Sequence, residues 1–325
     1  MNVDYPIDAV ILWVDGNDEL HKKKMLPFVS DTSKLKKKSF RERFDQVDEI
    51  QFSVNSILKF APYIRNIFVV TDNQIPGFLK HNNTQKYNSV KIIDHKDIFI
   101  DYQEYLPTFN CLPIETMITN IPGLAENFIY FNDDFFLIKK TTPSDFFREG
   151  KVVLRGEWRN YDSNIWHKNI VYKIRELFGG NPKQLTYGFK RSQQNIARKL
   201  GVQKYYKFDH TPAPLKKSTI DAYFKENPDM KLLNAKHKFR HHTQFTLQGL
   251  GNHLEIMNNN AILKKDYQLV YFGSYGKPFL WYKFVFWCGN KQQNKLFMCL
   301  QSLNNCSPKK LKFITTWLSK QINDA

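Results

Sequence analysis

Two adjacent carboxylates follow an apolar run near the middle of the chain. Residues 128–131 are aromatic or β-branched, as in a buried strand, and Asn132, Asp133 and Asp134 come directly after them. Such a strand end delivers three oxygen-bearing side chains to the edge of a sheet, where open α/β sheets bind their ligands. Carboxylate oxygens suit Mg²⁺ or Mn²⁺, and those ions suit a diphosphate. Because Asn and Asp also form turns, an ordinary hairpin turn is the alternative interpretation.

A second strand end rich in carboxylates lies near the N-terminus. Residues 9–14 form a continuous apolar run that includes Trp13, the pattern of a strand buried on both faces. The run leads into a turn that contains Asp15, Gly16 and Asp18. Nucleotide-binding α/β folds have such a turn after their first strand, whereas an ordinary Asp-Gly turn is the alternative.

Alternating strands and helices must position these side chains. In the first half we expect strands over 9–14, 67–70, 90–93 and 128–131, and helices over 48–60 and from Pro113 past Glu115. This alternation predicts an α/β fold with a mainly parallel sheet flanked by helices. In the second half we expect helices over 193–200, 218–226, 243–258, 294–303 and 308–321, and strands over 267–286. A lysine-rich stretch over 21–39 is predicted to be a loop.

The composition indicates an anionic partner. The chain of 325 residues carries a formal net charge of +17, which suits a nucleic acid, a phosphorylated substrate or an anionic membrane surface. Its four cysteines form no CxxC pair, which fits a reducing compartment and argues against a zinc site. The first residues lack a signal sequence and no apolar run is long enough to span a membrane, so we expect a cytoplasmic location.

Several stretches together resemble the Stealth family of sugar-1-phosphate transferases. That family includes bacterial capsular and cell-wall polysaccharide phosphotransferases and the animal lysosomal-enzyme N-acetylglucosamine-1-phosphotransferase. The stretches are DAVILWVDGND at 8–18, RF at 43–44, DEIQFSVNSI at 48–57, APYIRNIFVVTDNQIP at 61–76, LPTFN at 106–110, IE at 114–115, NDD at 132–134, HTPAP at 210–214 and FRH at 239–241. Their order along the chain makes the resemblance specific. The chain departs from the family pattern at Phe52, Val54 and Asn55, and a fourth family region near the C-terminus matches poorly.

The resemblance implies an activity, a metal cofactor and a domain organisation. A UDP-sugar would donate its sugar-1-phosphate to a hydroxyl of a growing polysaccharide, with Mg²⁺ or Mn²⁺ bound, and UMP would leave as a phosphodiester forms. Residues 1–155 would form the nucleotide-sugar-binding α/β core. Residues 156–206 would form a helical insertion suited to acceptor recognition, and residues 207–325 an α+β part that completes the site. The acceptor would be lipid-linked or polymeric, at the inner face of a bacterial membrane.

The resemblance also assigns roles to individual residues. Asp133 and Asp134 would bind the metal ion. His210, fixed by the proline-rich segment that follows it, would take the acceptor proton. Arg240, expected close to a helix N-terminus, would stabilise the phosphoryl oxygens. The remaining expected site residues are Asp18 as a further catalytic carboxylate and, for substrate binding, Trp13, Asp15, Gly16, Arg43, Glu115 and Asn132.

Two other functions stay open at this point. A conventional metal-dependent glycosyltransferase would use the same sheet and donor but release UDP, and residue spacing cannot separate it from a phosphotransferase. A basic nucleic-acid-binding protein or nuclease would also account for the charge. Against it, lysines concentrate in the 21–39 stretch and no motif that reads DNA or RNA is present. We therefore interpret the charge as attraction to an anionic membrane surface and expect no nucleic-acid partner.

Overall fold

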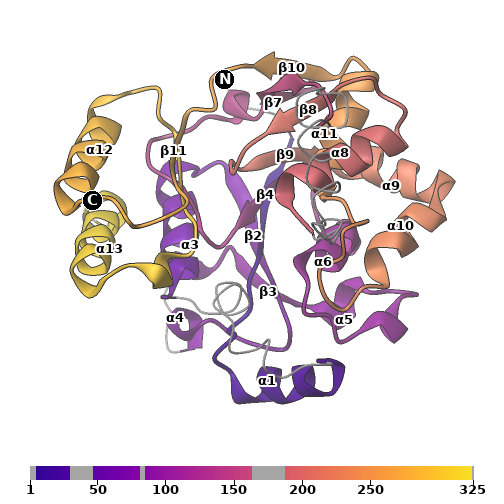
Figure 1. The fold of residues 1–325 in the computed structure, drawn as a ribbon, viewed down its shortest axis with the longest axis horizontal. Coiled ribbons are helices and arrows are strands. Elements are labelled where there is room, and N and C mark those ends of the chain that lie inside the picture. The colour runs from indigo at the N-terminus through magenta and orange to yellow at the C-terminus, as the bar shows by residue number, and fades with distance from the viewer. Residues whose placement is uncertain (1–4, 30–46, 81–84, 163–186, 324–325) are drawn as a thin grey trace, which may run out of the picture.

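A five-stranded sheet lies at the centre of the protein (Figure 1). A computed structural model describes residues 5–29, 47–80, 85–162 and 187–323. The sheet has the order β3-β2-β1-β4-β9, in which the first four strands are parallel and β9 runs antiparallel to β4. Its strands are β1 (Ile7–Leu12), β2 (Ile64–Thr71), β3 (Val90–Asp94), β4 (Asn127–Asn132) and β9 (Ala213–Lys216). The predicted α/β class with a mainly parallel sheet is confirmed.

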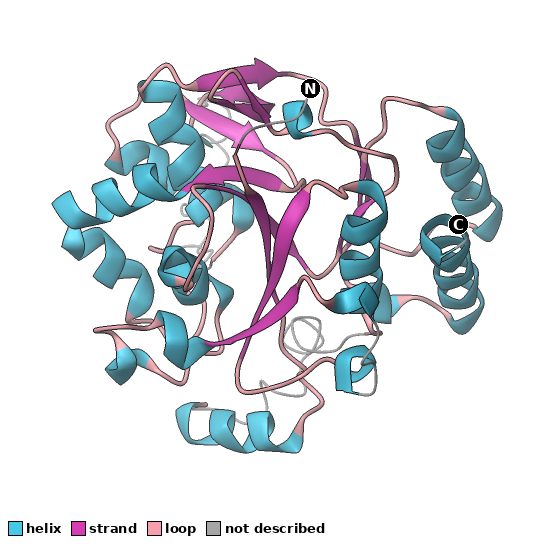
Figure 2. Cartoon of the chain, turned by 180° about the vertical axis from the view of Figure 1, so that it is seen from behind, coloured by secondary structure: helices cyan, strands magenta, loops and turns pink. Residues whose placement is uncertain are grey.

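Helices cover both faces of this sheet (Figure 2). All six residues of β1 are buried, and alternate side chains enter two different apolar clusters. Ile11 packs in the cluster of α3 (Glu49–Phe60), whereas Val10 packs in that of α6 (Cys111–Met117) and α11 (Leu247–Met257). This two-sided burial explains why the strand is a continuous apolar run rather than an alternating one. Among the described residues the other α-helices are α1 (Glu19–Met25), α4 (Gly77–Lys80), α5 (His95–Ile98), α8 (Phe189–Lys199), α9 (Lys217–Glu226), α10 (Pro228–Ala235), α12 (Phe279–Lys291) and α13 (Pro308–Asn323).

The register of the sheet brings the two carboxylate-rich strand ends to one edge. Leu12 of β1 pairs with Asn132 of β4 on one side and with Val70 of β2 on the other. The chain therefore leaves β1 at Trp13 and β4 at Asp133 at the same level of the sheet.

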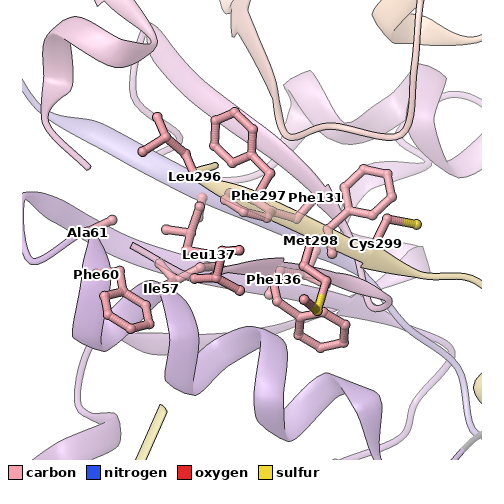
Figure 3. Packing of buried hydrophobic residues seen from close by; sticks show 14 of the residues in the cluster. Ile57, Phe60, Ala61, Phe131, Phe136, Leu137, Leu296, Phe297, Met298 and Cys299 are labelled. Atoms are coloured by element: carbon pink, nitrogen blue, oxygen red, sulfur yellow. The ribbon is translucent and has the colours of Figure 1, made fainter. Parts of the chain in front are cut away.

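Two smaller sheets attach the second half of the chain. One joins β10 (Ala261–Lys264), β7 (Lys151–Arg159) and β6 (Phe147–Arg148), and β8 (Tyr205–Phe208) also pairs with β7. The other has the order β11-β12-β5, with β11 at Leu269–Phe272, β12 at Phe297–Leu300 and β5 at Phe135–Leu137. Figure 3 shows Phe136 and Leu137 of β5 packed with Phe297 and Met298 of β12 above Ile57 of α3. Because β5 begins directly after Asp134, this sheet joins the C-terminal part of the chain to the carboxylates.

The contact between β7 and β8 depends on Gly156. A Cβ at this position would lie 2.4 Å from the carbonyl oxygen of Lys207 and 2.7 Å from the Tyr206 ring. We expect Gly156→Ala to lower the free energy of unfolding by about 1–3 kcal/mol, because the paired backbone must move apart. Urea denaturation measures this loss. Gly77→Ala is the matched control, since a Cβ there meets no atom within 4 Å, and an equal loss in both variants would contradict the prediction.

Three elements differ from the sequence-based expectation. The predicted strands over 267–286 are wrong beyond β11, because α12 occupies 279–291. Its helical period is hidden in the sequence, since the exposed positions are as aromatic as the buried Tyr282 and Phe286. The predicted helix over 294–303 is also wrong: β12 forms there, with all four residues buried between β11 and β5. Lysines 22–24, expected in a loop, lie in α1.

The predicted insertion is described only at its two ends. Residues 163–186, which carry most of its helical periodicity, lie outside the described residues. The described ends are the last residues of β7, then α8, then the start of β8. No helix in the described part of the chain is both long and apolar enough to cross a membrane.

Candidate active site

A cavity of about 560 Å³ opens at the edge of the central sheet where β1 and β4 end. Side chains from both halves of the chain line it. Those from the first half include Trp13, His21, Glu49, His95, Asn110, Cys111, Glu115, Tyr130, Asn132, Asp133 and Asp134. Those from the second half include Tyr187, Phe189, His210, Arg240, Thr246, Gln248, Gln301 and Ser302.

Three carboxylates cluster at the end of β4. Burial, together with the charges of Asp134 and Glu49, raises the pKa of Asp133 well above its usual range. Burial and the charge of Glu49 raise the pKa of Asp134, and burial raises the pKa of Glu49. Asp134 Oδ1 is enclosed and has no hydrogen-bond partner, while its Oδ2 accepts from Cys299 Sγ at 3.7 Å. A cluster of partly buried carboxylates that repel one another is an environment that a bound cation would stabilise.

The donor set fits a hard divalent cation that shares its coordination with substrate. Within the described residues, no group of three or more His, Cys, Asp or Glu side chains is arranged to hold a metal ion by itself. Mg²⁺ usually takes only one or two protein carboxylates and completes its shell with water and substrate phosphates. The unpartnered oxygen of Asp134 and the adjacent Asp133 match that mode of binding.

Glu115 lies in a hydrogen-bonded group on the cavity wall. Tyr130 OH lies 2.8 Å from Asn132 Oδ1 and 3.3 Å from Glu115 Oε1, and the backbone N–H of Leu247 donates to Glu115 Oε2 at 3.2 Å. Burial raises the pKa of Glu115 to about 7. This group ties the end of β4 to α6 and to the first residue of α11.

Arg240 reaches the cavity from a loop. Its Nη2 donates to Cys111 Sγ at 3.3 Å, and its guanidinium carbon lies 5.1 Å from the centre of the Tyr187 ring. The sequence placed Arg240 at a helix N-terminus; instead, α11 begins at Leu247 and is capped by Thr246. The buried amide of Gln244 holds the loop, because Gln244 Oε1 accepts from Asn110 Nδ2 at 2.9 Å. The loop is thereby fixed to the N-cap residue of α6.

His210 is held between two aromatic rings. Its ring stacks on Phe189 at 4.5 Å and on Tyr271 at 5.3 Å between centroids, with interplanar angles of 20° and 4°. Burial lowers the pKa of His210 below its usual 6.5. The imidazole is therefore neutral at pH 7 and able to accept a proton.

The structure brings most of the expected site residues to this cavity. Trp13, Glu115, Asn132, Asp133, Asp134, His210 and Arg240 all line it. Asp15, Gly16 and Asp18 are not among the lining residues. Asp18 caps α1 by accepting from the N–H of Leu20 at 2.8 Å, and it also accepts from Gln74 Nε2 at 2.9 Å. Arg43 lies outside the described residues.

Other cavity residues were missed from the sequence. Glu49 lies in the stretch 48–57, whose pattern predicts only the start of a helix; the packing of α3 on β5, which follows Asp134, brings its side chain to the cavity. No local sequence pattern marks Phe189 and Tyr271 as site residues, because only the tertiary fold stacks their rings on His210.

Comparison with known proteins finds a conserved family region and several related sequences. Residues 43–154 match the model of "Stealth protein CR2, conserved region 2". The chain is 43% identical to the capsular polysaccharide phosphotransferase fcs1 of Haemophilus influenzae, over 72% of this chain and 61% of that protein. It is 41% identical to the exopolysaccharide phosphotransferase cps2G of Lactiplantibacillus plantarum, over 45% of this chain and 40% of that protein. The third relative is the capsular polysaccharide phosphotransferase cps1A of Actinobacillus pleuropneumoniae, 32% identical over 72% of this chain and 60% of that protein.

Solved structures with a similar arrangement of elements are distant. Mouse xyloside xylosyltransferase 1 aligns with a TM-score of 0.43 at 9% identity, over 93% of this chain and 100% of that chain. The galactosyltransferase LgtC, in complex with donor and acceptor sugar analogues, aligns with a TM-score of 0.42 at 9% identity, over 96% of this chain and 95% of that chain. Likeness at these scores carries no inference about activity. The chain spans about three fifths of two of its curated relatives and 40% of the third, so the match concerns only part of each of those proteins. Residues 43–154 therefore carry conserved region 2 of the Stealth proteins, and the chain is similar in sequence to capsular and exopolysaccharide phosphotransferases over part of their length.

Proposed function

We propose that the protein transfers a sugar-1-phosphate from a UDP-sugar to a hydroxyl of a growing polysaccharide, forming a phosphodiester and releasing UMP. The observation that carries this proposal is the meeting, in one cavity, of a pair of partly buried carboxylates with a histidine whose pKa burial lowers. The carboxylate pair suits a metal-bound diphosphate, and the histidine suits removal of a proton from a hydroxyl. The relatives are phosphotransferases by name, which supports the same chemistry.

The carboxylates would hold Mg²⁺ or Mn²⁺. Asp133 and Asp134 supply the oxygens, and Glu49 adds negative charge beside them. The bound ion would neutralise charge on the diphosphate. Trp13 and Asn132 lie at the same strand ends and would contact the donor. The turn after β1, which contains Asp15, Gly16 and Asp18, would act indirectly by holding Trp13 in position. Gln74 fixes this turn because it forms hydrogen bonds with both Asp15 and Asp18.

The protein's own groups would handle the proton and the phosphoryl charge. The neutral His210 takes the proton of the acceptor hydroxyl as the hydroxyl oxygen attacks the phosphorus nearest the sugar. The phosphorus–oxygen bond to UMP then breaks. Arg240 donates to the phosphoryl oxygens, with Arg43 as a second candidate donor. Glu115 orders the wall beside Arg240 through Tyr130 and Leu247.

The acceptor would enter from the side of the 156–206 segment. Tyr187 and Phe189, which belong to that segment, line the cavity, and aromatic rings are suited to the apolar faces of sugars. A lipid-linked or polymeric glycan is the acceptor we infer, presented at the inner face of a bacterial membrane.

Arg240→Lys tests the phosphoryl role. Lysine keeps the charge but loses the planar fork of donors, so we expect kcat/KM to fall by about 10- to 100-fold. Steady-state kinetics with the wild type and the variant measures the change. Arg198→Lys is the control: this arginine lies over the Tyr161 ring and is not among the cavity-lining residues, so activity should stay at the wild-type level. Unchanged kinetics in Arg240→Lys would remove Arg240 from the proposed site.

Nucleotide product analysis tests the reaction itself. The protein is incubated with Mg²⁺ or Mn²⁺, a panel of UDP-sugars and a hydroxyl-bearing glycan extract, and the nucleotides are separated. We expect UMP, together with a new phosphodiester signal by phosphorus NMR. Formation of UDP instead would identify a conventional glycosyltransferase and overturn the proposal.

A further inference from the structure

Helix α12 presents large apolar side chains to solvent along one face. Leu280, Phe284 and Trp287 recur at helical spacing and are 75%, 61% and 57% exposed. Trp281 adds to the same surface at 39%. Figures 1 and 2 show α12 at one end of the molecule, next to α13 and remote from α9 and α10. We call these four side chains the α12 face.

The opposite side of α12 is firmly packed. Phe286 contacts the Trp317 ring of α13 at 4.7 Å and the Phe313 ring at 5.6 Å between centroids, and Tyr282 stacks on Phe272 of β11 at 5.7 Å. The helix is therefore held by its buried side chains and by the Trp281 ring, which contacts Phe272 at 5.7 Å between centroids, whereas Leu280, Phe284 and Trp287 remain mostly exposed. A contiguous exposed aromatic surface on a fixed helix is the mark of an interaction site.

The segment of the chain that carries this face has charged side chains of one sign. Residues 267–323 contain eight lysines and no arginine, aspartate or glutamate. Lys291 lies at the face itself, with Nζ 5.9 Å from the centre of the Trp287 ring. Lys283, on the same helix, has Nζ 5.2 Å from the centre of the Phe279 ring. Lys309 Nζ, at the start of α13, is 5.1 Å from the Phe279 ring. The complement of such a surface is apolar at its centre and anionic around it.

An anionic lipid bilayer has this chemistry. Helices that lie in the membrane interface carry Trp, Phe and Leu on the buried face and lysines whose ammonium groups reach back to the headgroups. We propose that the α12 face docks the protein on an anionic membrane, with Leu280, Phe284 and Trp287 inserted among the headgroups and Lys283 and Lys291 against lipid phosphates. Each lysine near such a surface adds attraction that falls off within the screening length of the solution.

The docking helix is connected directly to the cavity. It joins β11, whose Tyr271 stacks on His210, to β12, which leads into the cavity residues Gln301 and Ser302. Docking through α12 would therefore hold the cavity at the surface where a lipid-linked acceptor is found. This consequence rests on the proposed function, whereas the docking itself does not.

Vesicle co-sedimentation of the full chain tests the proposal without any turnover. Vesicles of phosphatidylcholine alone are compared with vesicles that also contain phosphatidylglycerol, at low and high salt. We expect binding to the mixed vesicles, a blue shift of tryptophan fluorescence on binding, and weakening by salt. Phe284→Ser with Trp287→Ser should lower the partition coefficient by at least about tenfold. Lys283→Glu with Lys291→Glu should lower it by a similar factor, about tenfold, on the anionic vesicles.

Matched variants on other surfaces provide the controls. Leu20→Ser with Met257→Ser removes apolar side chains that are 68% and 50% exposed, and Lys225→Glu with Lys199→Glu reverses two exposed charges on α9 and α8. These variants should bind as the wild type does. Equal binding by the α12 variants, or no preference of the wild type for anionic vesicles, overturns the proposal. Loss of a dimer in sedimentation velocity when the α12 face is changed would also overturn it, because the face would then bind a second copy of the chain. Failure of vesicle binding with normal UMP release would leave the proposed function intact.

Discussion

Asp134→Asn is expected to abolish turnover while leaving the protein at least as stable as the wild type. The two effects have one physical origin. The carboxylate of Asp134 is partly buried, with Oδ1 enclosed, near Asp133 and Glu49, so its charged form costs the folded state free energy that a bound cation would offset. The neutral amide removes that cost and also removes an oxygen ligand with a full charge. We expect kcat to fall by at least about a thousandfold.

The raised pKa values also predict how the stability of the protein changes with pH. The pKa values of Asp133, Asp134 and Glu115 are raised in the folded state, so the folded state binds more protons than the unfolded state above about pH 4. Without divalent cations, the free energy of unfolding should therefore fall as the pH rises from about 5 to about 8. Asp134→Asn should reduce that fall, and Mn²⁺ should raise the wild-type melting temperature at about pH 8 more than that of the variant.

Asp145→Asn is the control for these melts, because this aspartate lies outside the cavity, at the end of a short 3₁₀ turn where it accepts from Thr142. Its response to pH and Mn²⁺ should match the wild type. A large drop in the melting temperature of Asp134→Asn at every pH would mean that Asp134 is structural.

His210→Gln is expected to lower kcat by about 10²- to 10⁴-fold, the range for loss of a positioned general base. In the wild type, kcat/KM should decrease at acid pH with an apparent pKa below 6.5, because protonation removes the base and burial disfavours the charged ring. The variant should lose this acid limb. Measurement of kcat/KM between about pH 5 and about pH 8 tests both statements.

Tyr271→Phe separates the histidine's chemistry from its packing. Phenylalanine keeps the ring that stacks on His210, so the pH profile should stay close to that of the wild type. Tyr271→Ala removes one side of the stack, and a freer, better-solvated imidazole should have a higher apparent pKa. If His210→Gln keeps the acid limb, another group is the base.

The sequence predicts the sheet and its ligand edge because both depend on local patterns. Buried strands are recognised in the sequence as apolar runs. Because β1 and β4 are parallel neighbours, the residues that follow them, Trp13 and Asp133, lie at one edge of the sheet. The family-like stretches then single out Glu115, His210 and Arg240, all of which reach the cavity. The predicted turn carboxylate Asp18 has the right composition for a site but is used by the helix that it caps.

The rest depends on contacts between distant segments. Phe189 and Tyr271 stack on His210 only because the fold brings α8 and β11, far apart in the sequence, to the loop before β9. In α12 the exposed positions carry the same residue types as the buried ones, so neither helical nor strand period stands out. In β12 the four-residue run Phe297–Leu300 is short enough to fit either element, and its pairing with β5 decides the outcome.

The pairing of β5 with β12 also has a consequence for folding during synthesis of the chain. Strand β5 emerges from the ribosome early, with the wholly buried Phe136 and Leu137, but its partner β12 lies far downstream. Until β12 is translated, the apolar edge of β5 lacks that strand, and nascent chains expose it to one another and to chaperones. A chain released before Phe297 would keep the carboxylates of β4 and yet aggregate, so premature termination there would yield insoluble material rather than a partly active enzyme.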